Sequence, residues 1–252
     1  MKYIQKLLST TTPGKRLSKN FVKLHYIQES NISKKNIVHD ELESFLLELP
    51  FKVIHVTGTA GKGSTSNMIA KGLELAGFRV GLFTSPHIFS VTQRIQINSN
   101  SISELKLEQL LKYFFTLYPD IMFSEILTLV AIEYFKEQKI DFAVFEVFVG
   151  GELDTTNIFK SSATVITSIG LDHQQILGNS YEEILTQKLG ILRSNTPLFT
   201  RLKHPIIDLK VKLTGAVYHY VTRIEETNLE GDFQKENAGL AYEVLNYFLI
   251  DS

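Results

Sequence analysis

Cysteine is absent from this sequence of 252 residues. Its absence excludes disulfides, thiolate metal sites and a cysteine nucleophile, and it fits a reducing compartment. The sequence also lacks any apolar run close to the roughly 18 to 20 residues that span a bilayer, and its N-terminus lacks the apolar core of a signal peptide. We therefore expect a cytoplasmic protein that has no membrane partner.

An excess of charge of one sign is lacking as well. Lysine and arginine number 26 and aspartate and glutamate number 27, so the formal net charge is −1. This balance gives no support to a nucleic-acid partner held by bulk charge. Hydrophobic residues make up 44% of the chain, which is enough for a substantial core. We expect one large globular domain, with or without a small appendage.

A glycine-rich stretch, residues 53–65 (VIHVTGTAGKGST), is the most informative part of the sequence. Residues 52–56 have the pattern of a short buried strand, and helical spacing begins at Lys62. Between a strand and a helix, glycines let backbone N–H groups approach a phosphate, while the helix start and a lysine add positive charge. We therefore predict a nucleotide phosphate loop, in which Lys62 holds the β- and γ-phosphates. Its predicted nucleotide-binding residues are Gly58, Thr59, Gly61, Lys62, Gly63, Ser64 and Thr65.

The spacing of this stretch differs from the common G-x-x-x-x-G-K-[ST] motif. Val56 stands where the first glycine belongs, and Gly63 separates the lysine from the hydroxyl residues. Taken by itself, the stretch has an alternative interpretation as a glycine-rich turn that binds no ligand.

Strand and helix patterns alternate along the rest of the chain. The predicted strands are residues 52–56, 79–85, 142–148, 163–169, 197–200 and 216–221, and the predicted helices are residues 62–77, 103–118, 124–139, 180–192 and 234–249. This alternation predicts an α/β fold with a mostly parallel sheet and helices on both faces. Ligands of such folds gather outside the carboxyl ends of the strands, where the sequence places Lys62, Ser85, Glu146 and His173.

Glu146 interrupts an apolar strand, residues 142–148, close to its carboxyl end. A carboxylate buried in such a run costs free energy unless it is paired or binds a metal. We therefore predict a charged or metal partner for Glu146.

With these residues in hand, the chain resembles the folylpolyglutamate synthase and dihydrofolate synthase family, part of the ATP-dependent Mur ligase superfamily, from about residue 53 to residue 245. The motifs that carry the resemblance are residues 55–64 (HVTGTAGKGS), residues 81–87 (GLFTSPH) with Arg94 and Ile95, Glu146 with residues 150–157 (GGELDTTN), residues 170–173 (GLDH), Lys188, and Gln234 with Asn237. Their order and number make the resemblance highly specific.

The resemblance implies a P-loop-type Mur ligase central domain that binds ATP, at residues 51–252, with residues 1–50 as an N-terminal extension packed on it. It implies an amide ligase that joins a carboxylate of a folate to the amino group of L-glutamate through an acyl phosphate. The implied cofactors are ATP and Mg²⁺, and the implied substrates are a folate and L-glutamate.

The resemblance also implies roles for single residues. Lys62 would neutralise the phosphates, Ser85 with Glu146 would hold one magnesium ion, and His173 with Glu146 would hold a second. Lys188 can carry a carbamate in the family, so the implied catalytic residues are Lys62, Glu146, His173 and Lys188. Asn157, Gln234 and Asn237 match nucleotide-side positions, and Pro86, His87 and Arg94 match positions near the folate. Without the resemblance, His173 would be interpreted as a surface histidine and Lys188 as a solvated helix residue.

The sequence departs from the family in three ways. Family members continue into a second α/β domain, which we expect to be absent here, and Ala60 and Glu152 replace a frequent asparagine and the usual arginine. Three alternatives follow. The chain is a ligase completed by another polypeptide or by a second copy, or it binds or hydrolyses ATP with magnesium without ligation, or it is a nonenzymatic remnant that binds a nucleotide or a protein partner.

Overall fold

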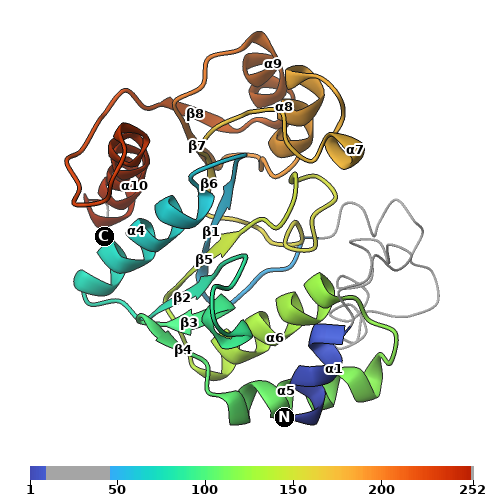
Figure 1. Ribbon diagram of the computed structural model, residues 1–252. Coiled ribbons are helices and arrows are strands. Elements are labelled where there is room, and N and C mark those ends of the chain that lie inside the picture. The colour runs from blue at the N-terminus through green and yellow to red at the C-terminus, as the bar shows by residue number, and fades with distance from the viewer. Residues whose placement is uncertain (10–45, 251–252) are drawn as a thin grey trace.

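The computed structural model describes residues 1–9 and 46–250, whose strands form one sheet in the order β4-β3-β2-β5-β1-β6-β7-β8 (Figure 1). The strands are β1 (Lys52–Thr57), β2 (Val80–Phe83), β3 (Ile95–Ile97), β4 (Asn100–Ser101), β5 (Phe142–Glu146), β6 (Ala163–Ile166), β7 (Pro197–Thr200) and β8 (Val217–Tyr220). Neighbours from β2 to β8 pair in parallel, whereas β3 pairs antiparallel with both β2 and β4. The predicted mostly parallel sheet is therefore confirmed.

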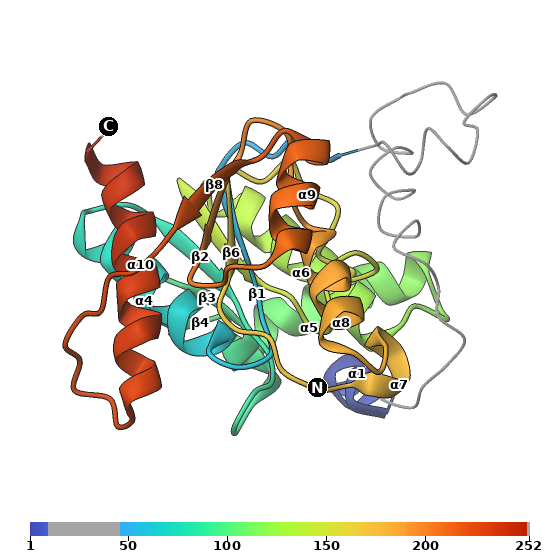
Figure 2. The ribbon, with the colours of Figure 1, turned by 90° about the horizontal axis from the view of Figure 1, so that it is seen from above.

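Helices cover both faces of this sheet, as predicted. They are α1 (Lys2–Ser9), α4 (Lys62–Leu75), α5 (Glu104–Leu117), α6 (Phe123–Glu137), α7 (Gln174–Leu177), α8 (Tyr181–Leu189), α9 (Pro205–Thr214) and α10 (Asp232–Ile250), with a 3₁₀ turn at Val91–Arg94. Figure 2 shows α4 and α10 on one side of the strands and α5, α6, α8 and α9 on the other. The central strands are accordingly buried on both faces, which explains their nearly continuous apolar runs.

Side chains alternate between these two faces along β1. Ile54 and Val56 pack in the core formed with α4 and α10, while Val53 packs in the core formed with α5 and α6. The alternation also turns His55 and Thr57 toward the second face, since successive side chains of a strand point to opposite sides.

Five α-helices and β-strands of the structure have no counterpart in the sequence predictions. They are α1, the β3–β4 hairpin, α7 and α9. All are short, since the longest, α9, has 10 residues, and β3 and β4 have 3 and 2. These elements form because of tertiary contacts, which hydrophobic periodicity in the sequence does not reveal.

The carboxyl ends of β1, β2 and β5 meet at one edge of the sheet. Val56 of β1 lies opposite Glu146 of β5, and Phe83 of β2 lies opposite Phe145. This register brings the loop after β1, the residues after β2 and the end of β5 together, as predicted for an α/β fold.

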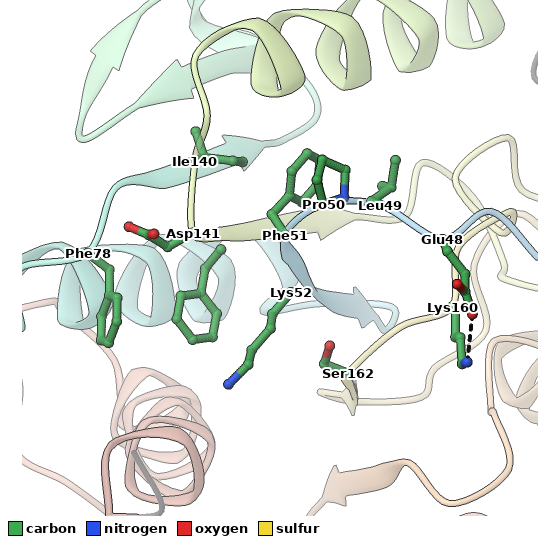
Figure 3. Close-up of a pocket in the computed structure, with 11 residues that line it drawn as sticks. Glu48, Leu49, Pro50, Phe51, Lys52, Phe78, Ile140, Asp141, Lys160 and Ser162 are labelled. Atoms are coloured by element: carbon green, nitrogen blue, oxygen red, sulfur yellow. Dashed lines mark hydrogen bonds and ion pairs between the residues drawn. The ribbon is translucent and has the colours of Figure 1, made fainter.

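A broad groove lies at the other end of the same strands (Figure 3). Its lining includes Lys52 at the start of β1, Phe142 at the start of β5 and Ser162 just before β6. Because these are amino ends of strands, the groove is remote from the glycine loop and does not belong to the predicted site.

No helix within the two described ranges is long and apolar enough to cross a membrane.

Helix α1 is attached to the core by one leucine and one glutamate. Leu7 is fully buried against the apolar cluster of α5 and α6, and Glu108 of α5 accepts the backbone N–H groups of Tyr3 and Ile4 at 2.7 and 2.9 Å. Residues 1–9 therefore contribute to the same core as α5 and α6.

We expect Leu7→Ala to lower the free energy of unfolding by about 2 to 5 kcal/mol, because it leaves a cavity in this core. The matched control is Leu8→Ala, since the neighbouring Leu8 is 43% exposed and its truncation should cost well under half as much. Urea unfolding of the two variants measures both values. Equal losses would show that α1 does not dock through Leu7.

Candidate functional site

The glycine loop, residues 58–61, connects β1 to α4. Gly58 and Gly61 have φ angles of +154° and +82°, which side-chain-bearing residues rarely adopt. A Cβ atom on Gly58 would lie 1.9 Å from Thr167 Oγ1, and one on Gly61 would lie 2.4 Å from Asn237 Oδ1. Both positions therefore require glycine, because the loop passes directly against the end of β6 and the start of α10.

The residues that follow β6 hold this loop in place. Thr59 N–H donates to the Ser168 carbonyl at 2.8 Å, and Ala60 N–H donates to Ser168 Oγ at 3.0 Å. The Thr167 hydroxyl donates to the Ala60 carbonyl at 2.5 Å. Sequence reasoning missed Thr167 and Ser168, since a strand followed by two hydroxyl residues carries no specific signal. Their bonds satisfy the backbone of Ala60, so this position needs no side-chain amide to keep its conformation.

Two lysines converge on the carbonyl of Gly58. Lys62 Nζ of α4 donates to it at 3.0 Å, and Lys188 Nζ of α8 donates to it at 2.8 Å. Lys188 is 3% exposed, and burial together with the charge of Lys62 lowers the pKa of Lys188 to about 8. An anion bound next to these two ammonium groups would be strongly stabilised by their positive charge.

Glu146 lies beside Gly63, in the first turn of α4, directly after the glycine loop. Its Oε2 accepts the backbone N–H of Ser85 at 3.1 Å and would be 3.6 Å from a Cβ atom on Gly63. Burial raises the pKa of Glu146 to about 7, although the charges of Lys62 and Arg94 act in the opposite direction. The structure therefore brings together Lys62, Ser85 and Glu146, as the sequence predicted.

The residues Ser85 and Glu146 suit a magnesium ion. Magnesium takes oxygen ligands and is usually held by one or two carboxylates together with substrate phosphates and water. In the part of the chain that the structure describes, no group of three or more histidine, cysteine or acidic side chains could hold a metal ion. A magnesium ion here would thus depend on phosphate oxygens for much of its coordination.

His173 lies at the entrance of the small cleft that Lys62, Lys188 and Gly150 also line. It has a left-handed backbone with φ of 50°, and its half-exposed ring is 3.7 Å from the carboxylate of Asp172. Glu146 does not line this cleft. A magnesium ion shared by His173 and Glu146 stays a prediction.

Among the predicted nucleotide-side residues, Asn237 and Thr65 adjoin the glycine loop. Asn237 packs against Gly61 and donates to Gln234 Oε1 at 3.0 Å. The hydroxyl of Thr65 is fully buried and has no hydrogen-bond partner among the described residues, so its contact with a nucleotide stays a prediction. These contacts fit a nucleotide beside the loop.

Asn157 is held differently. Its amide donates to the carbonyls of Glu152 and Gly190 at 3.0 and 3.1 Å and accepts a bond from Arg193. Glu152 itself pairs through its backbone N–H with the Gln187 carbonyl at 2.8 Å. Asn157 therefore ties the segment after β5 to the end of α8, and a contact of Asn157 with a nucleotide stays a prediction.

The predicted substrate residues lie in the segment after β2. A cis peptide bond joins Ser85 to Pro86, and Arg94 Nε donates to His87 Nδ1 at 2.8 Å. The guanidinium of Arg94 lies over the rings of Phe123 and Phe148, at 5.0 and 5.9 Å from their centroids. Because a guanidinium only donates, Nδ1 of His87 is the acceptor of this bond, and burial together with the charge of Arg94 lowers the pKa of His87.

Gln93 fixes the loop formed by residues 86–90. Its Oε1 accepts the backbone N–H groups of Ile88, Phe89 and Ser90 at 3.1, 2.9 and 3.2 Å. The side chains of Ile88 and Phe89 are 81% and 88% exposed. Sequence reasoning missed Gln93, although the S-x-x-Q spacing from Ser90 is the signal of a capping box, which the structure contains.

Comparison with known proteins gives a consistent result. The family model described as Mur ligase middle domain matches residues 56–243. A putative folylpolyglutamate synthase of Dictyostelium discoideum is 36% identical over 225 residues, and a dihydrofolate synthase/folylpolyglutamate synthase of Bacillus subtilis is 41% identical over 167 residues. A solved structure described as an FPGS-AMPPCP-folate complex superposes with a TM-score of 0.79 at 26% identity.

The matched regions cover most of this chain but a smaller part of each related protein. The two relatives match 77% and 63% of this chain, which corresponds to 36% and 39% of their own lengths. The solved complex matches 99% of this chain and 68% of its own. The chain thus spans little more than a third of the length of these two curated relatives.

Glu146 gives a prediction about pH. Its pKa of about 7 in the folded protein lies above the ordinary value of 4.5, so the native state binds this proton more readily than the unfolded chain does. The proton on Glu146 therefore stabilises the folded state fully below pH 4.5, and this stabilisation is lost as the pH rises through 7. The free energy of unfolding decreases by at most about 3 kcal/mol over this interval. The free energy of unfolding of the wild type minus that of Glu146→Gln should fall over this interval.

Urea unfolding between pH 4.5 and 8, in the presence of a chelator, measures the difference. The exposed Glu230→Gln gives the baseline for removing a carboxylate. A difference that stays constant with pH would contradict the burial of Glu146 in this site.

Proposed function

Since the chain belongs to the Mur ligase family and resembles its folylpolyglutamate synthases, we propose that it takes part in the ATP-dependent addition of L-glutamate to a folate. The observation that carries the proposal is the convergence of Lys62, Lys188 and Glu146 around the glycine loop. A magnesium-bound nucleotide needs cations for its phosphate oxygens and a carboxylate for its magnesium ion.

The reaction transfers the γ-phosphoryl group of ATP to a carboxylate of the folate, and the amino group of glutamate then displaces phosphate from the acyl phosphate. Phosphoryl transfer needs positioning and charge neutralisation more than covalent chemistry from the protein. Lys62 and Lys188 would neutralise phosphate oxygens above the Gly58 carbonyl that both of them contact. Ser85 and Glu146 would hold magnesium, which shields the transferring phosphoryl group when bound.

The buried lysine supports this assignment in a second way. Burial and the neighbouring cation Lys62 make protonated Lys188 unfavourable in the free protein, although the charges of Asp172 and Asp154 act in the opposite direction. A bound polyphosphate would relieve this repulsion, and so would conversion of Lys188 to a carbamate. Either change would make Lys188 part of the working site.

The acceptor would bind beside the segment after β2. Ile88 and Phe89 present apolar surface next to Pro86 and His87, and Arg94 supplies a cation close to Glu146. A planar heterocycle with a carboxylate tail fits such a surface. The solved relative described as an FPGS-AMPPCP-folate complex supports a folate as the acceptor.

The first experiment measures phosphate release with ATP and magnesium, in the presence and absence of tetrahydrofolate plus L-glutamate, and the mass of the folate product. We expect release that depends on both acceptors, a folate heavier by one or more glutamyl units, and a loss of at least about 100-fold in Lys62→Ala. Lys71→Ala is the matched control, because Lys71 lies on the same helix but pairs with Glu74 at its surface. Phosphate release that ignores the acceptors would indicate an ATPase, and absence of nucleotide binding would contradict the proposal.

The loop of residues 86–90 gives a separate prediction. Gln93→Leu removes the oxygen that accepts three backbone N–H groups, so the loop should lose its fixed shape. We expect the KM for the folate to rise by about tenfold, while the affinity for an ATP analogue changes by less than about twofold. Gln93→Glu keeps the acceptor oxygen and should keep a KM close to that of the wild type. Equal effects of the two substitutions would contradict a role for this oxygen in folate binding.

A further inference from the structure

Three buried side chains form a hydrogen-bonded chain beneath the segment that follows β5. His55 Nε2 lies 2.8 Å from Thr156 Oγ1, and the Thr156 hydroxyl donates to Asp154 Oδ1 at 2.6 Å. An ionised carboxylate only accepts, so the threonine oxygen must accept its own bond from the N–H of His55. All three residues are at most 6% exposed.

Asp154 uses this support to hold the turn of residues 147–153. Its Oδ2 accepts the N–H of Val149 at 2.9 Å, and its own N–H donates to the carbonyl of Gly151 at 3.1 Å. A second side chain of β1, that of Thr57, donates to the Gly150 carbonyl at 2.6 Å. His55 and Thr57 are two apart on β1 and share a face, so one strand holds the turn at two points.

The turn packs directly against residues of the candidate site. It starts directly after Glu146, and a Cβ atom on Gly151 would lie 3.0 Å from the Cα atom of Lys188. A Cβ atom on Gly150 would lie 2.6 Å from Leu177, at the end of the short helix that begins after His173. A shift of this backbone would therefore be transmitted to Glu146 on one side and to Lys188 on the other.

Asp154 is also linked to both residues by charge. Its carboxylate favours the protonated form of Lys188 and disfavours the ionised form of Glu146. Burial raises the pKa of Asp154 itself, against the hydrogen bonds from Thr156, Val149 and Phe148. These bonds keep a buried carboxylate in one orientation.

We infer that Asp154 is a positioning residue, held by His55 through Thr156, that fixes Glu146 and Lys188 relative to the glycine loop for binding of a magnesium-bound nucleotide. The inference rests on the proposed function for the identity of the ligand. The network itself is a property of this chain, and it acts through Glu146 and Lys188 without contact with the ligand.

Thr156→Val and Thr156→Ser test the inference as a matched pair. Valine keeps the shape of threonine but removes the hydroxyl, whereas serine keeps the hydroxyl. Three quantities are measured in each variant: the Kd for AMPPCP with magnesium, the Kd for AMPPCP with EDTA, and the hydrogen-exchange rates of the amides of Val149 and Gly151. We expect Thr156→Val to weaken magnesium-dependent binding by about tenfold or more, to leave the Kd in EDTA within about twofold, and to speed amide exchange. Thr156→Ser should resemble the wild type in all three.

Two outcomes would overturn the inference. Unchanged amide exchange in Thr156→Val would show that the hydroxyl does not hold the turn, and equal weakening with magnesium and with EDTA would show a general structural defect. If Thr156→Val does not fold, His55→Leu removes the far end of the network and is measured in the same way, with the same expectation in direction. If the wild type binds no AMPPCP, the proposed function fails, and the exchange rates alone decide whether Asp154 holds the turn.

Discussion

The carbonyl oxygen of Gly58 is the point on which the site depends. Two ammonium groups from residues 126 positions apart, on α4 and α8, donate to this one atom. Such an arrangement is costly unless the surrounding structure imposes it, because each cation disfavours the other. The cost makes sense if a polyanion occupies the position above the loop during function.

The elements around the glycine loop hold its backbone, and with it the Gly58 carbonyl, in a fixed position. The end of β6 bonds to the backbone of Thr59 and Ala60, and Asn237 of α10 closes the space beside Gly61. Gly151, in the turn after β5, packs against the backbone of Lys188. A rigid loop of this kind binds an anion with little reorganisation, since its donors are already oriented.

The two sides of the site are built by different means. The proposed nucleotide side is formed by the ends of β1, β5 and β6, within the parallel part of the sheet, and its Glu146 and Lys188 are buried. The proposed acceptor side is an exposed loop shaped by one glutamine side chain, with apolar residues facing solvent. Loops on a rigid scaffold vary more readily than strand ends, so differences in acceptor preference among related proteins would arise there.

The sequence by itself determined the order of strands and helices, the mostly parallel sheet and the glycine loop, because these depend on local periodicity and on a motif of adjacent residues. It also placed Lys62, Ser85 and Glu146 at one edge, since carboxyl ends of parallel strands share an edge. It did not predict α1, α9 or the β3–β4 hairpin, whose order comes from contacts with distant parts of the chain. Only the tertiary structure decided that Asn157 bonds to Arg193, that Lys188 reaches the Gly58 carbonyl and that His55 supports Asp154 through Thr156. Each of these depends on side-chain geometry across tens of residues of sequence, where neither spacing nor residue type specifies the partner.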